Sequence, residues 1–359
     1  MIGAVVRTLG LRAVLAVSVV GGLLAGCSSG SGTSGGAPTS ERPAAGARNH
    51  VAGASEGPSA APSALADGMG SDAAKDGQFP RTVSHYRGTT RLDAAPTRIA
   101  VLSTGQLDDL LSLGVVPAAS TRAQNAGLVP GYLRDAFPQY GEELAGMADA
   151  GTRTAPNLES LAAVKPDLIL VNDTLGDLYP KLSKIAPTVV TKGQGINWKR
   201  DLLLVGAAVG KGEQAQKLLA DITEDAATRG RKLGGAGTTV SMVRFTPDRT
   251  RMFGVSSFTG SIAADMGLGR PKSQRFTAIS QDIGAESIDV ADGDWIFYSV
   301  QGKEAKTEAG SLLAGPLWQS LKAVKAGHAV RVDDDPWYLN AGPAAARLVV
   351  GEIAGKLGA

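Results

Sequence analysis

The chain has 359 residues, enough for more than one domain at roughly 150 residues each. Its 36 Lys and Arg nearly balance its 34 Asp and Glu, which argues against a dedicated nucleic-acid-binding protein, and a hydrophobic share of 43% excludes bulk disorder. A single cysteine excludes an internal disulfide and a cysteine-based zinc framework.

The first 26 residues have the pattern of a secretion signal. Arg7 and Arg12 precede an apolar run over residues 13–25, which is too short and too glycine-rich for a comfortable membrane-spanning helix. The run ends in Leu24-Ala25-Gly26-Cys27, which resembles the lipobox of bacterial lipoproteins. That resemblance implies that Cys27 is acylated and anchors the mature chain to the extracytoplasmic face of the cell membrane, as two acyl chains suffice to do.

Residues 27–77 have the composition of a lipid anchor followed by a flexible linker. Of the 50 residues after Cys27, 37 are Gly, Ala, Ser, Pro or Thr, and the first aromatic residue of the chain is Phe79. Such a segment buries too little apolar area to offset its conformational entropy. We therefore expect the folded part to begin at residue 78.

After Phe79, short apolar strands alternate with helices. Residues 82–92 alternate around Gly88 and predict a hairpin. The next apolar segments predict strands over 98–102, 115–119, 167–171 and 188–190 and helices over 107–113, 157–164, 175–185 and 202–209, with Asn157 as an N-cap. This alternation is typical of a parallel sheet covered by helices on both faces.

A long helix separates this block from a second α/β block. Residues 213–233 contain no proline and place Ala215, Leu218, Leu219 and Ile222 on one apolar stripe. The second block predicts strands over 238–245, 251–255, 295–300 and 329–332 and helices over 260–266, 317–324 and 343–357. We therefore predict an N-terminal lobe at 78–210, a connecting helix at 211–234 and a C-terminal lobe at 235–359. Each lobe is Rossmann-like with a mostly parallel sheet, and a ligand cleft lies between them.

This order of elements after a lipobox resembles the helix-linked class of bacterial solute-binding proteins of ABC importers, over about residues 78–357. The second lobe resembles the iron-siderophore-binding members in particular. The stretches that carry the resemblance are Pro96–Leu102, Leu107–Gly114, Gly151-Thr152, Pro156–Leu161, Lys165–Leu170, Ile185–Thr188, Asn197-Trp198, Arg244-Phe245, Phe253-Gly254, Phe258 and Gly267-Leu268.

The resemblance implies a tethered monomeric binding protein, not an enzyme, that captures a ferric siderophore and delivers it to an ABC permease driven by its ATPase. A ferric siderophore sheathes its iron in its own oxygens, so neither a protein metal site nor a cofactor is expected. The balanced charge and the scattered arginines favour a hydroxamate of the desferrioxamine kind over a tris-catecholate, which carries about three negative charges.

Ligands of open α/β sheets bind outside the carboxyl ends of the strands. This rule predicts cleft positions at 103–106, 120–122, 172–173, 191–192, 244, 301 and 333–338. Arginine supplies a rigid fork of donors and aromatic rings supply apolar contact area. The candidate ligand-binding residues are therefore Arg122, Trp198, Arg244, Phe253, Phe258, Trp337 and Tyr338. Each also has a structural alternative, lobe packing for the aromatics and an ion pair for the arginines. The run at 333–335 is interpreted as a solvated acidic turn, because the loop spacing of a calcium site is absent.

Two glutamates match the family's permease-docking pattern, in which each lobe offers one carboxylate to permease arginines. Glu159 lies nine residues before Leu168 in the strand predicted over 167–171, and Glu286 lies nine residues before Trp295. The equal offsets support pseudo-symmetry of the lobes. Either residue could instead be an ordinary first-turn carboxylate of a helix.

Three alternatives stay open at this stage. The same fold could bind haem or cobalamin. A lipid-anchored enzyme would need a nucleophile–base or metal constellation, and the part after residue 77 offers only His85 and His328 and no cysteine. A cell-envelope interaction or signalling lipoprotein on the same fold would not depend on Glu159 and Glu286.

Overall fold

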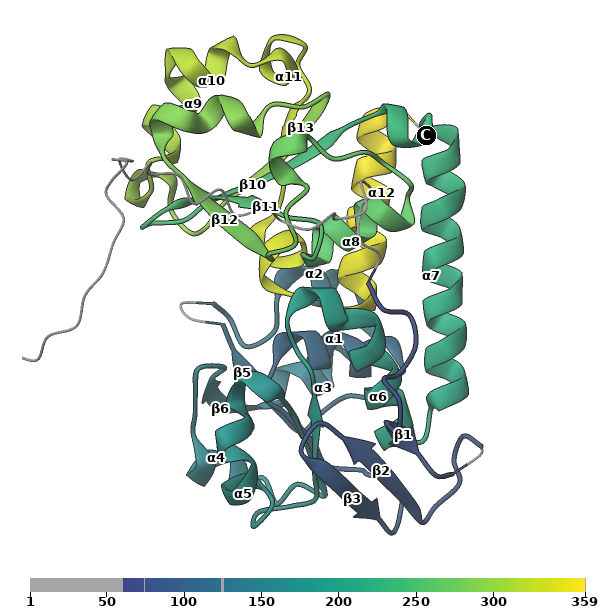
Figure 1. Cartoon of the computed structure of the whole chain (residues 1–359). Coiled ribbons are helices and arrows are strands. Elements are labelled where there is room, and N and C mark those ends of the chain that lie inside the picture. The colour runs from purple at the N-terminus through teal and green to yellow at the C-terminus, as the bar shows by residue number, and fades with distance from the viewer. Residues whose placement is uncertain (1–60, 74, 124–125, 359) are drawn as a thin grey trace, which may run out of the picture. The chain divides into compact units, whose positions relative to one another are not determined.

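The computed structural model describes residues 61–73, 75–123 and 126–358 (Figure 1). The predicted signal segment, the predicted acylation site Cys27 and most of the predicted linker lie outside these residues. Within them the chain forms two α/β lobes joined by one long helix, which confirms the predicted fold class.

The first lobe is built on a six-stranded sheet with the order β7-β6-β5-β4-β8-β9, in which every pair except β6 with β7 is parallel. Strands β4 and β9 are buried along their whole length, as short apolar strands with helices on both faces should be. The strands are β4 (Ile99–Val101), β5 (Ala119–Arg122), β6 (Ala148–Thr152), β7 (Ala155–Pro156), β8 (Leu168–Asn172) and β9 (Thr188–Thr191).

Helices α1 and η2 follow the parallel strands β4 and β8 almost directly, so their first turns lie at the carboxyl edge of the sheet. Asn157 caps α4 as predicted, with its side-chain oxygen accepting from the Glu159 and Ser160 N–H groups. The helices are α1 (Thr104–Ser112), α2 (Gly131–Ala136), η1 (Pro138–Tyr140), α3 (Gly141–Ala145), α4 (Leu158–Ala163), η2 (Asp173–Leu178), α5 (Tyr179–Leu182), η3 (Gly195–Asn197) and α6 (Trp198–Val209).

A separate antiparallel sheet of β1 (Gly70–Ser71), β2 (Arg81–His85) and β3 (Gly88–Leu92) precedes the lobe and contains the predicted hairpin. The predicted linker boundary at residue 77 is too late. Ala61 is already buried, β1 pairs with β2, and Asp76 accepts hydrogen bonds from the Glu213 and Gln214 N–H groups. Every residue type except proline can form such backbone hydrogen bonds, so a Gly/Ala/Ser-rich composition does not reveal them.

The connecting helix α7 spans Gly212–Lys232 and ends before Gly234, which has a φ of +83°. Its 21 residues make it about 30 Å long at 1.5 Å per residue. The predicted apolar stripe is the buried face, and Ala226 and Gly230 extend it. In Figure 1 this helix runs along one side of both lobes.

The second lobe has a five-stranded sheet with the order β12-β11-β10-β13-β14. Strands β10, β13 and β14 are parallel, and β11 and β12 are antiparallel additions. The strands are β10 (Val240–Phe245), β11 (Thr250–Phe253), β12 (Ser280–Ile283), β13 (Trp295–Val300) and β14 (Ala329–Arg331). The helices are η4 (Gly235–Gly237), α8 (Phe258–Asp265), η5 (Lys272–Gln274), η6 (Ala285–Ala291), η7 (Glu304–Lys306), α9 (Ala309–Ala314), α10 (Pro316–Ser320), α11 (Lys322–Lys325), η8 (Asp335–Leu339) and α12 (Pro343–Leu357).

Three predicted elements differ from the structure. The strand expected at 115–119 starts only at Ala119, because Val115 and Val116 instead pack partly buried against the core. The helix expected at 175–185 is instead the 3-10 helix η2, which is not helical at Leu175, followed by the short α5, which ends at Leu182. The helix expected at 317–324 is broken at Leu321, and Asp292 caps the new helix by accepting from the Lys322 and Ala323 N–H groups.

Several buried polar contacts hold the two lobes together. Asp108 on α1 accepts hydrogen bonds from the Ala344 and Ala345 N–H groups at the start of α12, at 2.8 and 3.0 Å. The Trp198 indole N–H on α6 donates to Ser261 on α8 at 3.1 Å, and Lys199 forms a buried ion pair with Asp265 at 2.6 Å. These contacts tie α1 and α6 of the first lobe to helices of the second.

The Asp108 contact should be worth a large share of the stability. Its carboxylate accepts four hydrogen bonds, two from the α12 N–H groups and two from the Ser112 and Tyr132 hydroxyls. We expect Asp108→Ala to lower the free energy of unfolding by about 3 kcal/mol, because it leaves buried donors unpaired. Urea denaturation followed by circular dichroism measures this. The control Asp221→Ala removes an exposed aspartate of α7 and should change it by less than about 0.5 kcal/mol. An equal effect of both substitutions would contradict the proposed importance of the contact.

Candidate functional site

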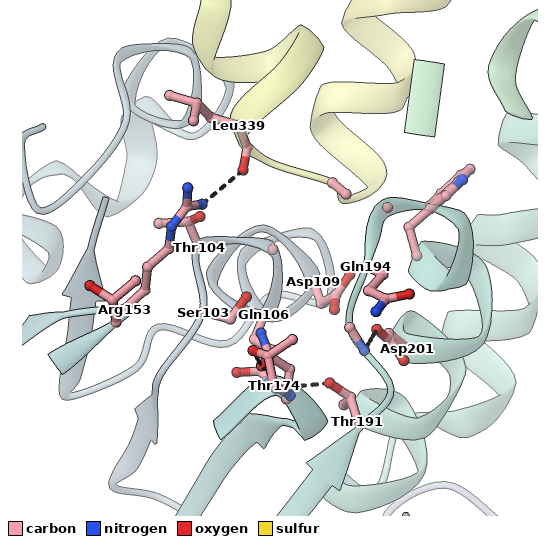
Figure 2. Close-up of a pocket in the computed structure, with 17 residues that line it drawn as sticks. Ser103, Thr104, Gln106, Asp109, Arg153, Thr174, Thr191, Gln194, Asp201 and Leu339 are labelled. Carbon is pink, nitrogen blue, oxygen red and sulfur yellow. Dashed lines mark hydrogen bonds between the residues drawn. The ribbon is translucent and has the colours of Figure 1, made fainter. Parts of the chain in front are cut away.

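A cavity of about 280 Å³ lies at the carboxyl ends of β4, β8 and β9 (Figure 2). Several predicted cleft positions line it, namely 103–106, Asn172 and Thr191. Leu339 and Ala341 of the second lobe complete its wall. The strand-end rule therefore locates the first-lobe side of this cavity from sequence.

Helix α1 forms the floor of the cavity. Gln106 and Asp109 lie three residues apart on it and so share one face, and each is only 2% exposed. The Gln106 amide N–H donates to the Thr191 hydroxyl at 3.1 Å, as Figure 2 shows. Neither the side-chain oxygen Oε1 of Gln106 nor Oδ1 of Asp109 has a hydrogen-bond partner among the described residues.

A second aspartate borders the same cavity. Asp201 on α6 accepts hydrogen bonds from the Lys192 and Gly193 N–H groups at 2.9 and 2.8 Å, yet burial raises its pKa to about 7. Burial raises the pKa of Asp109 well above its ordinary value, and the neighbouring Asp108 and Asp201 carboxylates add to the effect. The surroundings of Asp109 therefore disfavour its ionised form, and no described cation is paired with it.

Arg153 supplies positive charge at the border of the cavity, and it is not among the residues predicted from sequence. It follows β6 and donates from Nη1 to the Leu339 carbonyl oxygen at 3.1 Å. Burial lowers its pKa, and the nearby Arg244 lowers it further. Among the described residues Arg153 forms no ion pair, so its other donors stay available for a ligand. The adjacent Gly151-Thr152 was among the family-like stretches, but β6 has no apolar pattern to mark it as a strand end.

Arg244, the arginine favoured from sequence, is instead committed to an ion pair. It reaches the end of β10 as predicted, but its Nε and Nη2 both donate to the Asp334 carboxylate at 2.7 Å. Asp334 also accepts from the Ser299 hydroxyl at 2.6 Å. The run at 333–335 is therefore not simply a solvated turn, since its middle residue is the buried partner of Arg244.

The other predicted ligand-binding residues have separate places. Trp198 lines the cavity, and its ring meets Phe258 edge to face at 5.7 Å between centroids. Phe253 packs on Tyr338 at 4.6 Å, and the fully buried Trp337 stacks on Phe297.

The Tyr338 hydroxyl donates to the Phe297 carbonyl oxygen, which holds Tyr338 in this cluster. Arg122 pairs with Asp149 at 2.9 Å, and neither residue lines the cavity. Of the seven predicted residues, the structure thus brings only Trp198 into the cavity wall.

The two predicted docking glutamates occupy equivalent places in the two lobes. Glu159 lies in the first turn of α4, ahead of β8, and Glu286 lies in the first turn of η6, ahead of β13. Both are exposed. Strand β8 pairs in parallel with β4, the first strand of its sheet along the chain, and β13 does the same with β10.

Among the described helices, none is long and apolar enough to cross a membrane. The described residues also hold no group of three or more His, Cys, Asp or Glu side chains placed to bind a metal ion.

Comparison with known proteins identifies similar chains. The family model described as periplasmic binding protein matches residues 99–336. The "Probable siderophore-binding lipoprotein YfiY" of Bacillus subtilis is 34% identical over 76% of this chain and 86% of its own length. The "Fe(3+) dicitrate-binding periplasmic protein FecB" of Escherichia coli is 27% identical over 72% of this chain and 84% of its own. The crystal structure of Staphylococcus aureus SirA complexed with staphyloferrin B superposes with a TM-score of 0.67 at 28% identity, covering 77% of this chain and 98% of SirA. These relatives bind ligands, which confirms the expectation of a binding protein rather than an enzyme.

The raised pKa of Asp109 predicts a pH-dependent effect of Asp109→Asn. The unfolded chain releases this proton near pH 3.8, whereas the native state keeps it to a much higher pH. Above about pH 4 the native state of the wild type therefore binds more protons than the unfolded state, and the Asp109 contribution to stability falls as pH rises. We expect Asp109→Asn to gain stability relative to the wild type between pH 4 and pH 8. Urea titrations at pH 4, 6 and 8 check this, and a difference that does not vary with pH would contradict it.

Proposed function

The chain belongs to the periplasmic binding protein family, and we propose that it captures a ferric siderophore outside the cytoplasm and delivers it to the permease of an ABC importer. The observation that carries the proposal is the cavity at the strand ends, closed by both lobes and bordered by Arg153 with unused donors. A guanidinium fork suits the oxygens that surround a chelated iron.

The charge of the cavity supports a hydroxamate of the desferrioxamine kind. Among the described lining residues Arg153 is the one basic side chain, against Asp109 and Asp201. Ferric trihydroxamates carry no net charge at the iron centre, whereas a tris-catecholate brings about three negative charges that this cavity does not balance. The relative named for Fe(3+) dicitrate favours a ferric citrate complex as the second candidate.

In this proposal Trp198 forms the apolar wall that contacts the ligand. The Arg244–Asp334 pair and the packed Phe253, Phe258, Trp337 and Tyr338 shape the second-lobe wall behind it. Arg122, paired with Asp149, has no direct role.

A ligand panel tests the proposal through tryptophan fluorescence. We expect quenching by ferrioxamine B, and weaker or no quenching by ferric dicitrate, a ferric tris-catecholate, haem or cobalamin. Arg153→Ala should weaken ferrioxamine binding about tenfold or more, because hydrogen bonds from a charged donor are lost. Arg153→Lys should recover part of the affinity, and Arg229→Ala on the exposed face of α7 should leave it unchanged. Tight binding of haem or cobalamin with no quenching by any ferric chelate would overturn the proposal.

We further propose that Glu159 and Glu286 dock the loaded protein on the permease and that acylated Cys27 keeps it at the membrane. Their exposure and their equivalent positions ahead of β8 and β13 support a two-point contact. The relative named as a lipoprotein supports the anchor.

Transport assays separate docking from ligand binding. We expect Glu159→Ala and Glu286→Ala each to lower siderophore uptake by about tenfold or more, because each leaves a permease cation unpaired. Affinity for the free chelate should stay at the wild-type value. Glu143→Ala, which removes an exposed carboxylate of α3, is the control. Unchanged uptake in both glutamate variants would instead favour the cell-envelope interaction or signalling role.

A further inference from the structure

The floor of the cavity offers hydrogen-bond acceptors that no described donor meets. The side-chain oxygen Oε1 of Gln106 and Oδ1 of Asp109 are both buried and have no hydrogen-bond partner among the described residues. The side-chain Nε2 of Gln106 already donates to the Thr191 hydroxyl. Buried polar atoms without a partner are uncommon in native proteins, because each has lost its hydrogen bonds to water without replacement. Two such acceptors on adjacent turns of α1, in residues that line one cavity, point to a donor that arrives with the ligand.

The charged groups around the cavity floor indicate whether the ligand's donor is neutral or positively charged. The groups that act on Asp109 are the Asp108 carboxylate on its own helix and the Asp201 carboxylate on α6. Arg153 stands at the cavity border and donates to the Leu339 carbonyl oxygen. Lys192 and Arg200 act on Asp201, but only carboxyl groups act on Asp109, so a ligand hydroxyl would satisfy an acceptor there without bringing the positive charge that Asp109 lacks. An ammonium group would satisfy several acceptors at once, since it has three N–H donors, and would neutralise the local charge.

The size of the cavity limits what enters it. At about 280 Å³ it is slightly smaller than the roughly 300–1,000 Å³ of pockets that enclose a drug-sized ligand. An arm of a chelate fits such a volume, whereas a complete ferric siderophore does not. The iron centre would then lie toward the cavity border, where Arg153 is available.

We propose that Gln106 and Asp109 bind a primary ammonium group carried on an arm of the ferric siderophore, so that the protein prefers amine-bearing chelates. This inference rests on the proposed siderophore function and names the ligand group that the cavity floor selects. Burial raises the pKa of the Asp109 carboxyl, and a bound ammonium group, which keeps its own three protons, favours the carboxylate and lowers that pKa. Formation of the ion pair should therefore release protons from Asp109 to solvent.

Ferrioxamine B and its N-acetyl derivative form a suitable ligand pair, because they share the iron centre and differ in the terminal amine. We expect the wild type to bind ferrioxamine B about tenfold or more tighter than the acetylated form. Calorimetry in two buffers of different ionisation enthalpy should show proton release with ferrioxamine B and none with the acetylated form. Equal affinities for the two chelates would overturn the inference and leave the proposed siderophore function standing.

Asp109→Asn tests the residue itself. This variant keeps the side-chain shape, and we expect it to lose both the preference for the amine and the proton release while still binding N-acetyl ferrioxamine B. Retained binding of the acetylated chelate shows that the variant is folded. Asp221→Asn, on the exposed face of α7, is the matched control and should keep the preference and the proton release. An Asp109→Asn variant that still prefers the amine tenfold would overturn the assignment.

A probe without iron separates this inference from the proposed function. If the wild type binds neither ferrioxamine, the hydroxamate proposal fails, and n-pentylammonium chloride then decides the inference alone. Titration of the unliganded protein should shift the amide resonances of Thr191 and Gly193, which border the cavity. Those shifts should be absent in Asp109→Asn and present in Asp221→Asn. No shift in the wild type at millimolar pentylammonium would overturn the inference.

Discussion

The bond between Asp108 and the first turn of α12 fixes the geometry on which the site depends. Asp108 reaches from the first lobe to the Ala344 and Ala345 N–H groups, where the helix dipole favours a carboxylate. The approach is so close that a Cβ on Gly342 would lie 2.5 Å from the Asp108 side chain. Because α1 also carries Gln106 and Asp109, the contact that joins the lobes also sets the position of the cavity floor.

Adjacent residues on α1 thus have opposite surroundings. Asp108 is surrounded by four donors, whereas Asp109 Oδ1, one residue later, has none among the described residues. A helix turns by about 100° per residue, so neighbours face different elements. The Asp108 carboxyl group joins the two lobes, whereas Asp109 Oδ1 is left for a hydrogen-bond donor on the ligand.

The two arginines near the cavity, Arg244 and Arg153, also differ in whether their hydrogen-bond donors are already used. Arg244 and Asp334 are both largely buried, and their paired charges offset each other's desolvation. Among the described residues, Arg153 has only the Leu339 carbonyl oxygen as a hydrogen-bond partner, so its other donors stay free. The Trp198–Ser261 and Lys199–Asp265 contacts hold the walls around it in one arrangement. A preformed cavity of this kind limits the ordering cost of binding a ligand.

The sequence by itself determined the alternation of apolar strands and helices, because hydrophobic periodicity is a local property. Strand β13 and helix α12 have the predicted bounds, and the strand-end rule located residues 103–106, Asn172 and Thr191 at the cavity. Strands β1 and β6 have only polar or small residues, and β12 has one apolar residue, Ile283, so no local pattern marks them and they form through pairing with a neighbour. The same limit applies to the site. Whether an arginine is available depends on which carboxylate the fold brings to it, and only the tertiary structure decided that Arg244 is paired and Arg153 is not.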